Sequence, residues 1–183
     1  MYRIITDLES MFDDIDAARA YIQKVRTEGV SPYIPRHAAP GEDVTTPRIC
    51  VAPTLAGCAT SLGLLGIFRR CLNANESAKS YENDDEAYPV IVMKFPDGLD
   101  YVKPGADQVP DVDITDEHWL LEPAVPEWAR LRWIGAYSIL YDDEPELAVC
   151  TKITFLRSSL HKLHPWLDGR GHKLDSSETG DML

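Results

Sequence analysis

The chain has 183 residues, of which 44% are hydrophobic and 26% charged, a balance typical of one globular domain with a substantial core. No apolar run approaches the roughly 20 residues that a membrane-spanning helix needs. The first residues, "MYRIITDLESMFDD", carry acids where a signal peptide has bases, so we expect a soluble, cytoplasmic protein without a membrane partner. The formal net charge of −12 argues against nucleic acid as a direct ligand, because phosphate binding needs basic patches.

The first elements in the chain are predicted to be a helix and then an edge strand. "DDIDAARAYIQKVRTEG" (13–29) can begin at a cap formed by Asp13 or Asp14, and it ends at Gly29. Its apolar residues recur at helical spacing, namely Ile15, Ala18, Ile22 and Val25. "VSPYIPRH" (30–37) is β-rich but limited by proline, which indicates an edge strand.

A strand followed by a glycine-containing helix comes next. "RICVA" (48–52) is typical of a buried strand, and Pro53 ends it. The segment 54–72 then predicts a helix capped by Thr54, in which Gly57, Gly63 and Gly66 lower helix propensity. A helix that keeps three glycines is expected to pack closely against a neighbour on that side.

The second half of the chain predicts several strands. "PVIVMKF" (89–95) is apolar enough for a strand buried on both faces. A long connection (96–117) leads to predicted strands at 118–125, 130–141 and 147–156, the last of which can instead bend into a helix over 158–167. The order predicts one α+β domain over 1–174, with an N-terminal helix and a split, mostly antiparallel sheet. The acidic tail 175–183 is expected to be flexible.

The cysteines and histidines do not form a metal-binding pattern. Cys50, Cys58, Cys71 and Cys150 have spacings that match no zinc motif, so we expect reduced thiols, most of them buried. His161 and His164 lie three residues apart, and His172 follows, but no nearby acid or cysteine completes a ligand set. We therefore expect no metal.

Charge is concentrated in the middle of the chain. Residues 73–122 contain thirteen acids and three lysines, a net charge of −10. Within this segment, "NDDEAY" holds Asp84, Asp85 and Glu86 but lacks the alternating oxygen ligands and central glycine of a calcium loop. The segment is either a solvated, solubilising surface or a contact for a basic partner.

The segment "ITDEHWLLEP" offers a candidate for acid–base or electrostatic chemistry. Thr115, Asp116 and Glu117 directly precede a bulky apolar run. The structural interpretation is an acidic turn before a buried strand. The functional interpretation is a carboxylate held at a strand edge that faces a cleft.

Four segments that cover roughly residues 30–140 follow one another in a characteristic order: "PRHAAPGEDVTTPRICVAPTLAGCATSL", "YPVIVMKF", "QVPDVDITDEHWLLEP" and "RWIG". In this order they resemble small proteins of phages and bacterial mobile elements with an ADP-ribosyltransferase-like fold. The resemblance implies a cytoplasmic protein in a bacterial host cell, with NAD as its substrate.

The resemblance also implies roles for particular residues. In ADP-ribosyltransferases NAD lies between two small sheets, with a polar or basic residue of the first strand orienting it. Arg36 would take that place, and Arg48 to Thr54 would form the strand–helix wall of the nicotinamide pocket. Glu117 would be the catalytic carboxylate that stabilises the ribosyl cation, with Asp116 as its competitor. The pyrophosphate would contact Arg36, Arg48 or Lys103.

Two departures from the family pattern leave open whether the chain is an active enzyme. The residue before the catalytic acid is usually small in the family, often glycine, and here it is Asp116. The helix of the family usually carries an acid or a larger residue near the position of Gly57, and here that residue is unusually small. The chain is therefore expected to be either a mono-ADP-ribosyltransferase that modifies a host protein or an inactive relative that kept the fold.

The alternative is a non-enzymatic acidic inhibitor. An anti-CRISPR or other anti-defence protein could use the segment 73–122, and Asp84, Asp85 and Glu86 in particular, to occupy the basic nucleic-acid channel of a host defence complex. The two hypotheses differ in whether the activity of the protein depends on NAD or on salt concentration.

Overall fold

The computed structural model describes residues 1–6, 8–35, 38, 40–61, 87–135, 139–141 and 150–153. Helices and strands are mixed along the described chain, and every strand pairing in it is antiparallel. The predicted α+β class with a mainly antiparallel sheet is therefore confirmed. Across these residues no helix has both the length and the apolarity that crossing a membrane requires.

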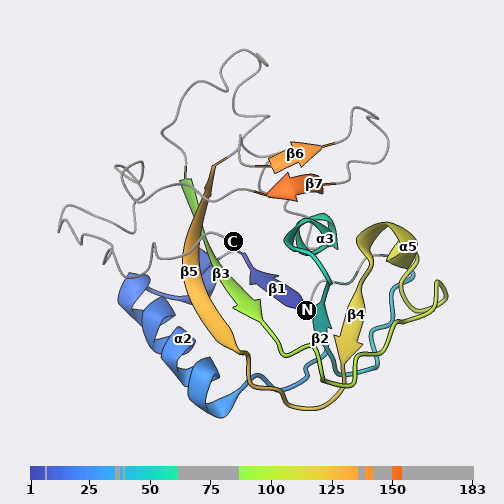
Figure 1. The fold of residues 1–183 in the computed structure, drawn as a ribbon, viewed down its shortest axis with the longest axis horizontal. Helices are drawn as coiled ribbons and strands as arrows, with labels where there is room; N and C mark the ends of the chain where they lie inside the picture. The colour runs from blue at the N-terminus through green and yellow to red at the C-terminus, as the bar shows by residue number, and fades with distance from the viewer. Residues whose placement is uncertain are drawn as a thin grey trace.

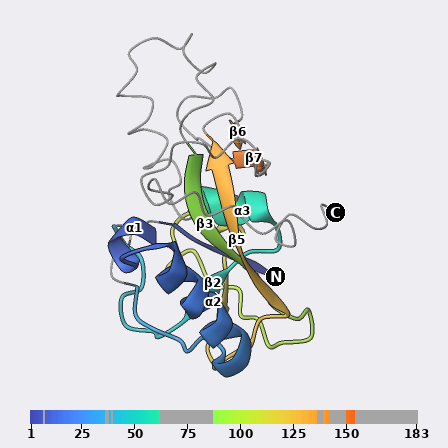
Figure 2. The same ribbon diagram turned by 90° about the vertical axis from the view of Figure 1, so that its left-hand side faces the viewer.

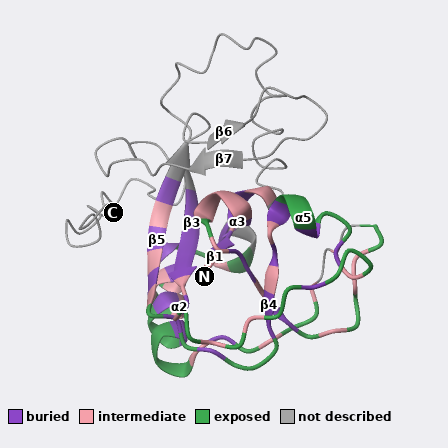
Figure 3. Cartoon of the chain, turned by 45° about the vertical axis from the view of Figure 1, so that its right-hand side comes forward, coloured by how far each residue is buried: buried purple, intermediate pink, exposed green. Residues whose placement is uncertain are grey.

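The largest sheet has three strands in the order β1–β3–β5 (Figure 1). They are β1 (Tyr2–Ile5), β3 (Ala87–Lys94) and β5 (Trp128–Gly135). The central strand β3 is the one predicted from "PVIVMKF", and its near-continuous apolar sequence fits a strand that is covered on both faces. Figure 3 shows buried residues running along β3 and β5, while the outward side of the neighbouring helix is exposed.

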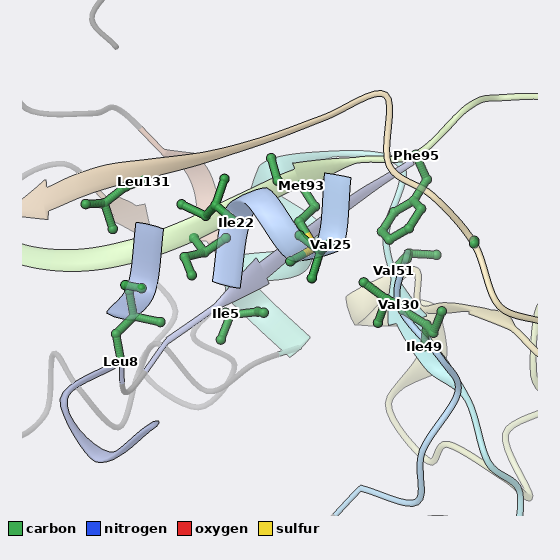
Figure 4. Packing of buried hydrophobic residues seen from close by; sticks show 14 of the residues in the cluster. Ile5, Leu8, Ile22, Val25, Val30, Ile49, Val51, Met93, Phe95 and Leu131 are labelled. Atoms are coloured by element: carbon green, nitrogen blue, oxygen red, sulfur yellow. The ribbon is translucent and has the colours of Figure 1, made fainter. Parts of the chain in front are cut away.

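One face of this sheet is covered by α2 (Ile15–Glu28), which follows the short helix α1 (Leu8–Met11) (Figure 2). Asp14 caps α2 by accepting a hydrogen bond from the Ala17 backbone N–H at 2.8 Å, and Gly29 ends it at a φ of +80°. The predicted apolar stripe is buried against the sheet. Figure 4 shows Ile22 and Val25 of this helix beside Ile5, Met93 and Leu131 of the strands.

The opposite face of the sheet is covered by α3 (Leu55–Ser61). Small side chains make this contact, including Cys58 and Ala59 of α3 packed against Ile4 and Val92. Gly57 makes a close approach on another side, since a Cβ built on it would lie 3.0 Å from the Thr115 carbonyl oxygen and 3.1 Å from the Ala52 Cβ. The predicted tight packing around the glycine of this helix is confirmed at Gly57, while Gly63 and Gly66 lie outside the described residues.

A second, two-stranded sheet pairs β2 (Ile49–Val51) with β4 (His118–Leu120). Its link to the first sheet is a bridge between Tyr2 and Ala52, with hydrogen bonds in both directions at 2.7 and 2.9 Å. The sheet is thus split, as predicted. Before β4 comes a short helix, α5 (Val112–Thr115), and a third pair joins β6 (Ile139–Tyr141) to β7 (Cys150–Ile153).

Three sequence-based expectations need correction or stay partly untested. The described fold begins with the strand β1 rather than with a helix, because "YRII" pairs with the buried β3. Residues 30–35 form isolated bridges, Val30 with Ala124 and Tyr33 with Arg48, rather than a continuous edge strand, since Pro32 and Pro35 interrupt the ladder. The helix predicted over 54–72 is described only as far as Ser61, and the acidic tail 175–183 lies outside the described residues.

Candidate functional site

The β2–β4 ribbon has one face in the main core and one polar face. Ile49, Val51 and Leu120 point into the main hydrophobic cluster. Cys50 pairs with Trp119 in the register of the ribbon, and both face the other way, beside Val109 and Val112. Because side chains alternate along strands, Arg48 and Glu117, each two residues from this pair, share the polar face.

Glu117 is a buried carboxyl group on this face, with 7% of its surface exposed. The Trp119 indole N–H donates to its Oε1 at 2.7 Å, and the Cys50 thiol donates a second hydrogen bond. Burial raises the pKa of Glu117, and the two hydrogen bonds counteract part of that shift. The site therefore holds a desolvated acid whose ionised form is supported by two fixed donors.

Cys50 is held in its thiol form by the same surroundings. Burial and the adjacent charge of Glu117 raise the pKa of Cys50 to about 12. A thiol with this pKa is a hydrogen-bond donor rather than a nucleophile at neutral pH. Cys50 therefore acts on Glu117 as a neutral donor.

Arg48 has no exposed surface and is bound almost completely within the fold. Its guanidinium donates to Glu42 Oε1 at 2.5 Å and to the carbonyl oxygens of Asp43 and Thr46 at 2.8 and 3.2 Å. It also stacks over the Trp119 ring at 4.4 Å from the ring centroid. These contacts leave only its Nε without a partner among the described residues, so Arg48 is held in the interior of the protein directly before β2.

Arg3 is a candidate that the sequence analysis missed. It lies on β1, the first strand of the fold, and its Nη2 donates to the Tyr33 hydroxyl at 2.6 Å. Its Nε and Nη1 are buried and have no hydrogen-bond partner in the described part of the chain. Two buried guanidinium nitrogens without hydrogen-bond acceptors are costly unless an anion or water meets them. The available signal was a basic residue inside an otherwise apolar strand, "YRII".

The backbone beside Arg3 and the backbone of Glu117 flank Ala52, the residue that follows β2, from opposite sides. Tyr2, next to Arg3, pairs with Ala52. One step beyond the Val51–His118 pair, the register sets Ala52 opposite Glu117. Arg3 also lies near enough for its charge to lower the pKa of Cys50, the thiol that donates to Glu117. The seam between the two sheets thus places Arg3 within electrostatic range of Cys50, the thiol that donates to the buried Glu117.

Asp116 and Glu117 are neighbours in sequence but lie in different surroundings. Asp116 is 49% exposed and forms an ion pair with Lys103 at 2.9 Å. Its backbone has a φ of +50°, in the left-handed region, where glycine, asparagine and aspartate are the favoured residues. This conformation gives a physical reason why a glycine or aspartate suits the position before the acid.

Of the remaining predicted site residues, one lies at the start of α3 and the others lie outside the described residues. Thr54 is exposed, and its hydroxyl accepts a hydrogen bond from the Gly57 N–H at 2.9 Å, which caps α3 as predicted. Arg36, together with Asp84, Asp85 and Glu86, lies outside the described residues. Within the described ranges, no group of three or more His, Cys, Asp or Glu side chains could hold a metal ion.

Comparison of the chain with protein-family models, with curated proteins and with solved structures found no match.

Proposed function

We propose that this chain binds NAD at the seam between its two sheets and transfers ADP-ribose from it to a host protein, in the manner of ADP-ribosyltransferase-like proteins. Two observations carry the proposal: the buried Nε and Nη1 of Arg3, which have no hydrogen-bond partner among the described residues, and the buried carboxyl group of Glu117. A dinucleotide offers both of the complementary features, an anionic pyrophosphate and a ribose that becomes positively charged during the reaction.

Arg3, rather than Arg36 or Arg48, is assigned the role of the first-strand basic residue in this proposal. Arg48 already donates to Glu42 and to two backbone carbonyls. Arg3 lies on the first strand, and its Nε and Nη1 have no hydrogen-bond partner among the residues that the structure describes. Its guanidinium would bind the pyrophosphate through Nε and Nη1, while Tyr33 fixes its Nη2.

Glu117 is assigned the electrostatic role. As the bond between nicotinamide and the ribose carbon breaks, its electron pair leaves with nicotinamide and positive charge develops on the ribose. A carboxylate held by Trp119 and Cys50 stabilises that charge without having to reorganise. The acceptor nucleophile of the host protein then attacks the ribose carbon and releases its proton to solvent.

The test is release of nicotinamide from NAD by the wild-type protein and by Glu117→Gln. The variant keeps the shape and removes the charge, so we expect it to fold and to release nicotinamide at least about a hundredfold more slowly. The matched control is Glu28→Gln, at an exposed residue at the end of α2, which should leave release unchanged. Full activity in Glu117→Gln would remove Glu117 from the site and direct attention to Asp116 or Glu122.

As a second candidate we propose a non-enzymatic inhibitor that binds a basic groove of a host defence complex. The observation in its favour is that most acids in the described part of the acidic segment are exposed, namely Asp97, Asp100, Asp107, Asp111, Asp113 and Glu122. Under this candidate, neutralising Asp84, Asp85 and Glu86 together slows association and flattens its salt dependence, while Glu117→Gln leaves inhibition intact. An unchanged association rate at every salt concentration would reduce this surface to a solubilising one.

A further inference from the structure

We infer that Arg48 and Trp119 are positioning residues that fix the Glu117 carboxyl group from behind, in a buried Arg48–Trp119–Glu117 relay. The inference rests on the proposed function for its kinetic consequence, because it concerns the carboxylate that the reaction would use. It adds a role for two residues that lie inside the wall of the site and do not contact the substrate.

The first contact of the relay fixes the plane of the indole. Arg48 and Trp119 lie diagonally across the β2–β4 ribbon, and the guanidinium carbon lies 4.4 Å from the centroid of the Trp119 ring. Both side chains are almost completely buried. A cation over the face of a tryptophan is attracted by the ring quadrupole, most strongly where water is excluded. The stacked guanidinium therefore restricts tilting of the indole.

The second contact transmits this orientation to Glu117. The indole has a single donor, Nε1–H, and here it donates to Glu117 Oε1 at 2.7 Å. Trp119 and Glu117 lie two residues apart on the same face of the ribbon, and Glu117 is itself buried. With water excluded, the carboxyl oxygen is held where the indole N–H points.

The relay is anchored in the loop before β2. Arg48 is held by Glu42 and by the carbonyls of Asp43 and Thr46. The loop is shaped in turn by Asp43, whose Oδ1 accepts from the Thr45 N–H and hydroxyl, both at 2.7 Å, and from the Thr46 N–H at 3.3 Å. The position of Glu117 therefore depends on a turn that lies three to seven residues before β2.

A purely structural role for Trp119 would require its bulk but not its N–H. The ionisable groups that act on Glu117 from neighbouring elements are Cys50, Arg48 and Glu42. Of the two donors to the carboxyl group, only the indole is itself stacked on a guanidinium. Removing the N–H alone therefore separates positioning from packing.

The experiment compares Trp119→Phe with Trp128→Phe. Trp128 is the matched control, since Arg130 also stacks over its ring, at 5.2 Å, but it lies on β5. We expect Trp119→Phe to lower the kcat of nicotinamide release about tenfold or more, the scale of one charge-assisted hydrogen bond, and to leave KM unchanged. Arg48→Lys, which keeps a charge near Glu42 but loses the planar face, should also lower kcat. Trp128→Phe should change neither constant.

Titration of Glu117 by carbon-detected NMR of its carboxyl group gives a readout that does not depend on catalysis. Loss of the indole donor should raise the pKa of Glu117 in Trp119→Phe and leave it unchanged in Trp128→Phe. If Trp119→Phe does not fold, 3-benzothienylalanine at position 119 replaces N–H by sulfur in a ring of nearly the same size and allows the same titration.

The possible results separate the relay from the proposed function. A Glu117 titration that is unaffected by loss of the indole N–H would overturn the relay. A wild-type kcat in Arg48→Lys would overturn the part assigned to Arg48. If the wild-type protein neither binds nor cleaves NAD, the proposed function fails, while a raised pKa of Glu117 in the Trp119 variants still supports the relay.

Discussion

Single residues in this protein have properties that their neighbours in sequence do not share. Asp116 is half exposed and paired with Lys103, whereas Glu117 is buried and receives hydrogen bonds from an indole and a thiol. The left-handed backbone at Asp116 turns the chain between them. Adjacent carboxyl groups are therefore kept at different depths, and only one of them is desolvated.

Because burial raises the pKa of Glu117, stability should depend on pH through this residue. A raised pKa means that the folded state binds the proton more tightly than the unfolded state, so Glu117 loses stabilising effect as pH rises above its usual pKa of 4.5. Glu117→Gln has no such loss. We expect the unfolding free energy of Glu117→Gln to increase relative to that of the wild type as pH rises from below 4.5 toward neutrality. Urea denaturation of both proteins at a series of pH values measures this difference.

The control for this measurement is Glu28→Gln, because Glu28 is exposed. Its surface ion pair with Lys24, at 3.9 Å, contributes little to stability. Its difference from the wild type should show no comparable trend with pH. A Glu117→Gln difference that stays constant over the whole pH range would contradict a desolvated carboxyl group.

The thiols of Cys50, which is partly buried, and of Cys58, which is buried, should be chemically inert in the folded protein. Burial raises the pKa of Cys50 and of Cys58 to about 12 in each case. At pH 8 the thiolate fraction is then of the order of 10⁻⁴, so iodoacetamide should label neither residue until the protein is denatured. Peptide mass spectrometry before and after denaturation measures this, and rapid labelling of Cys50 in the native protein would show that its site is open.

At the scale of elements, the seam between the two sheets depends on small residues. Gly57 of α3 lies against the carbonyl of Thr115 at the end of α5 and against Ala52 of the bridge. This contact holds α3 against the turn that leads to Glu117. Substitution there should therefore disturb both packing and the site.

Gly57→Leu is expected to destabilise the fold by about 1–3 kcal/mol, the usual cost of overpacking, because its Cβ would begin 3.0 Å from a backbone oxygen. Gly98→Leu is the matched control, since a Cβ there meets nothing within 4 Å. Melting temperatures of the two variants are the measurement. Equal melting temperatures would contradict close packing at Gly57.

The elements with strong periodicity could be predicted from the sequence, and those defined by a distant partner could not. α2 was recognised from its Asp14 cap and apolar spacing, and β3 from its apolar run, because both signals are local. β1 could not be predicted because four residues, one of them Arg3, are too few to show an alternation of apolar and polar side chains. The strand forms by pairing with β3, about 90 residues away.

The candidate site was predicted only in part for the same reason. Glu117 stood out because a carboxyl group precedes a bulky apolar run. The interior position of Arg48 was not foreseen, because arginine is seldom fully buried and its partners are a carboxylate and two carbonyls of a preceding loop. The donors of Arg3 become apparent only when β1 and Tyr33 are placed in space.

At the scale of the whole molecule, the net charge of −12 disfavours the binding of an anionic substrate. An acidic protein repels a pyrophosphate unless local basic groups reverse the potential. Arg48 is neutralised by Glu42, whereas the Nε and Nη1 of Arg3 have no partner in the described part of the chain. NAD binding should therefore depend on Arg3 far more than on other arginines of the surface.

The most direct test of the account is calorimetric titration of NAD into the wild-type protein, Arg3→Gln and Arg19→Gln. Arg19 is the matched control, because it lies on α2 and pairs with Asp16 at 3.3 Å. Loss of charge-assisted hydrogen bonds worth about 1.5–3 kcal/mol should raise the Kd of Arg3→Gln about tenfold or more, while Arg19→Gln binds as the wild type does. Absence of NAD binding by the wild-type protein, or equal affinity in Arg3→Gln, would contradict a dinucleotide site at this seam.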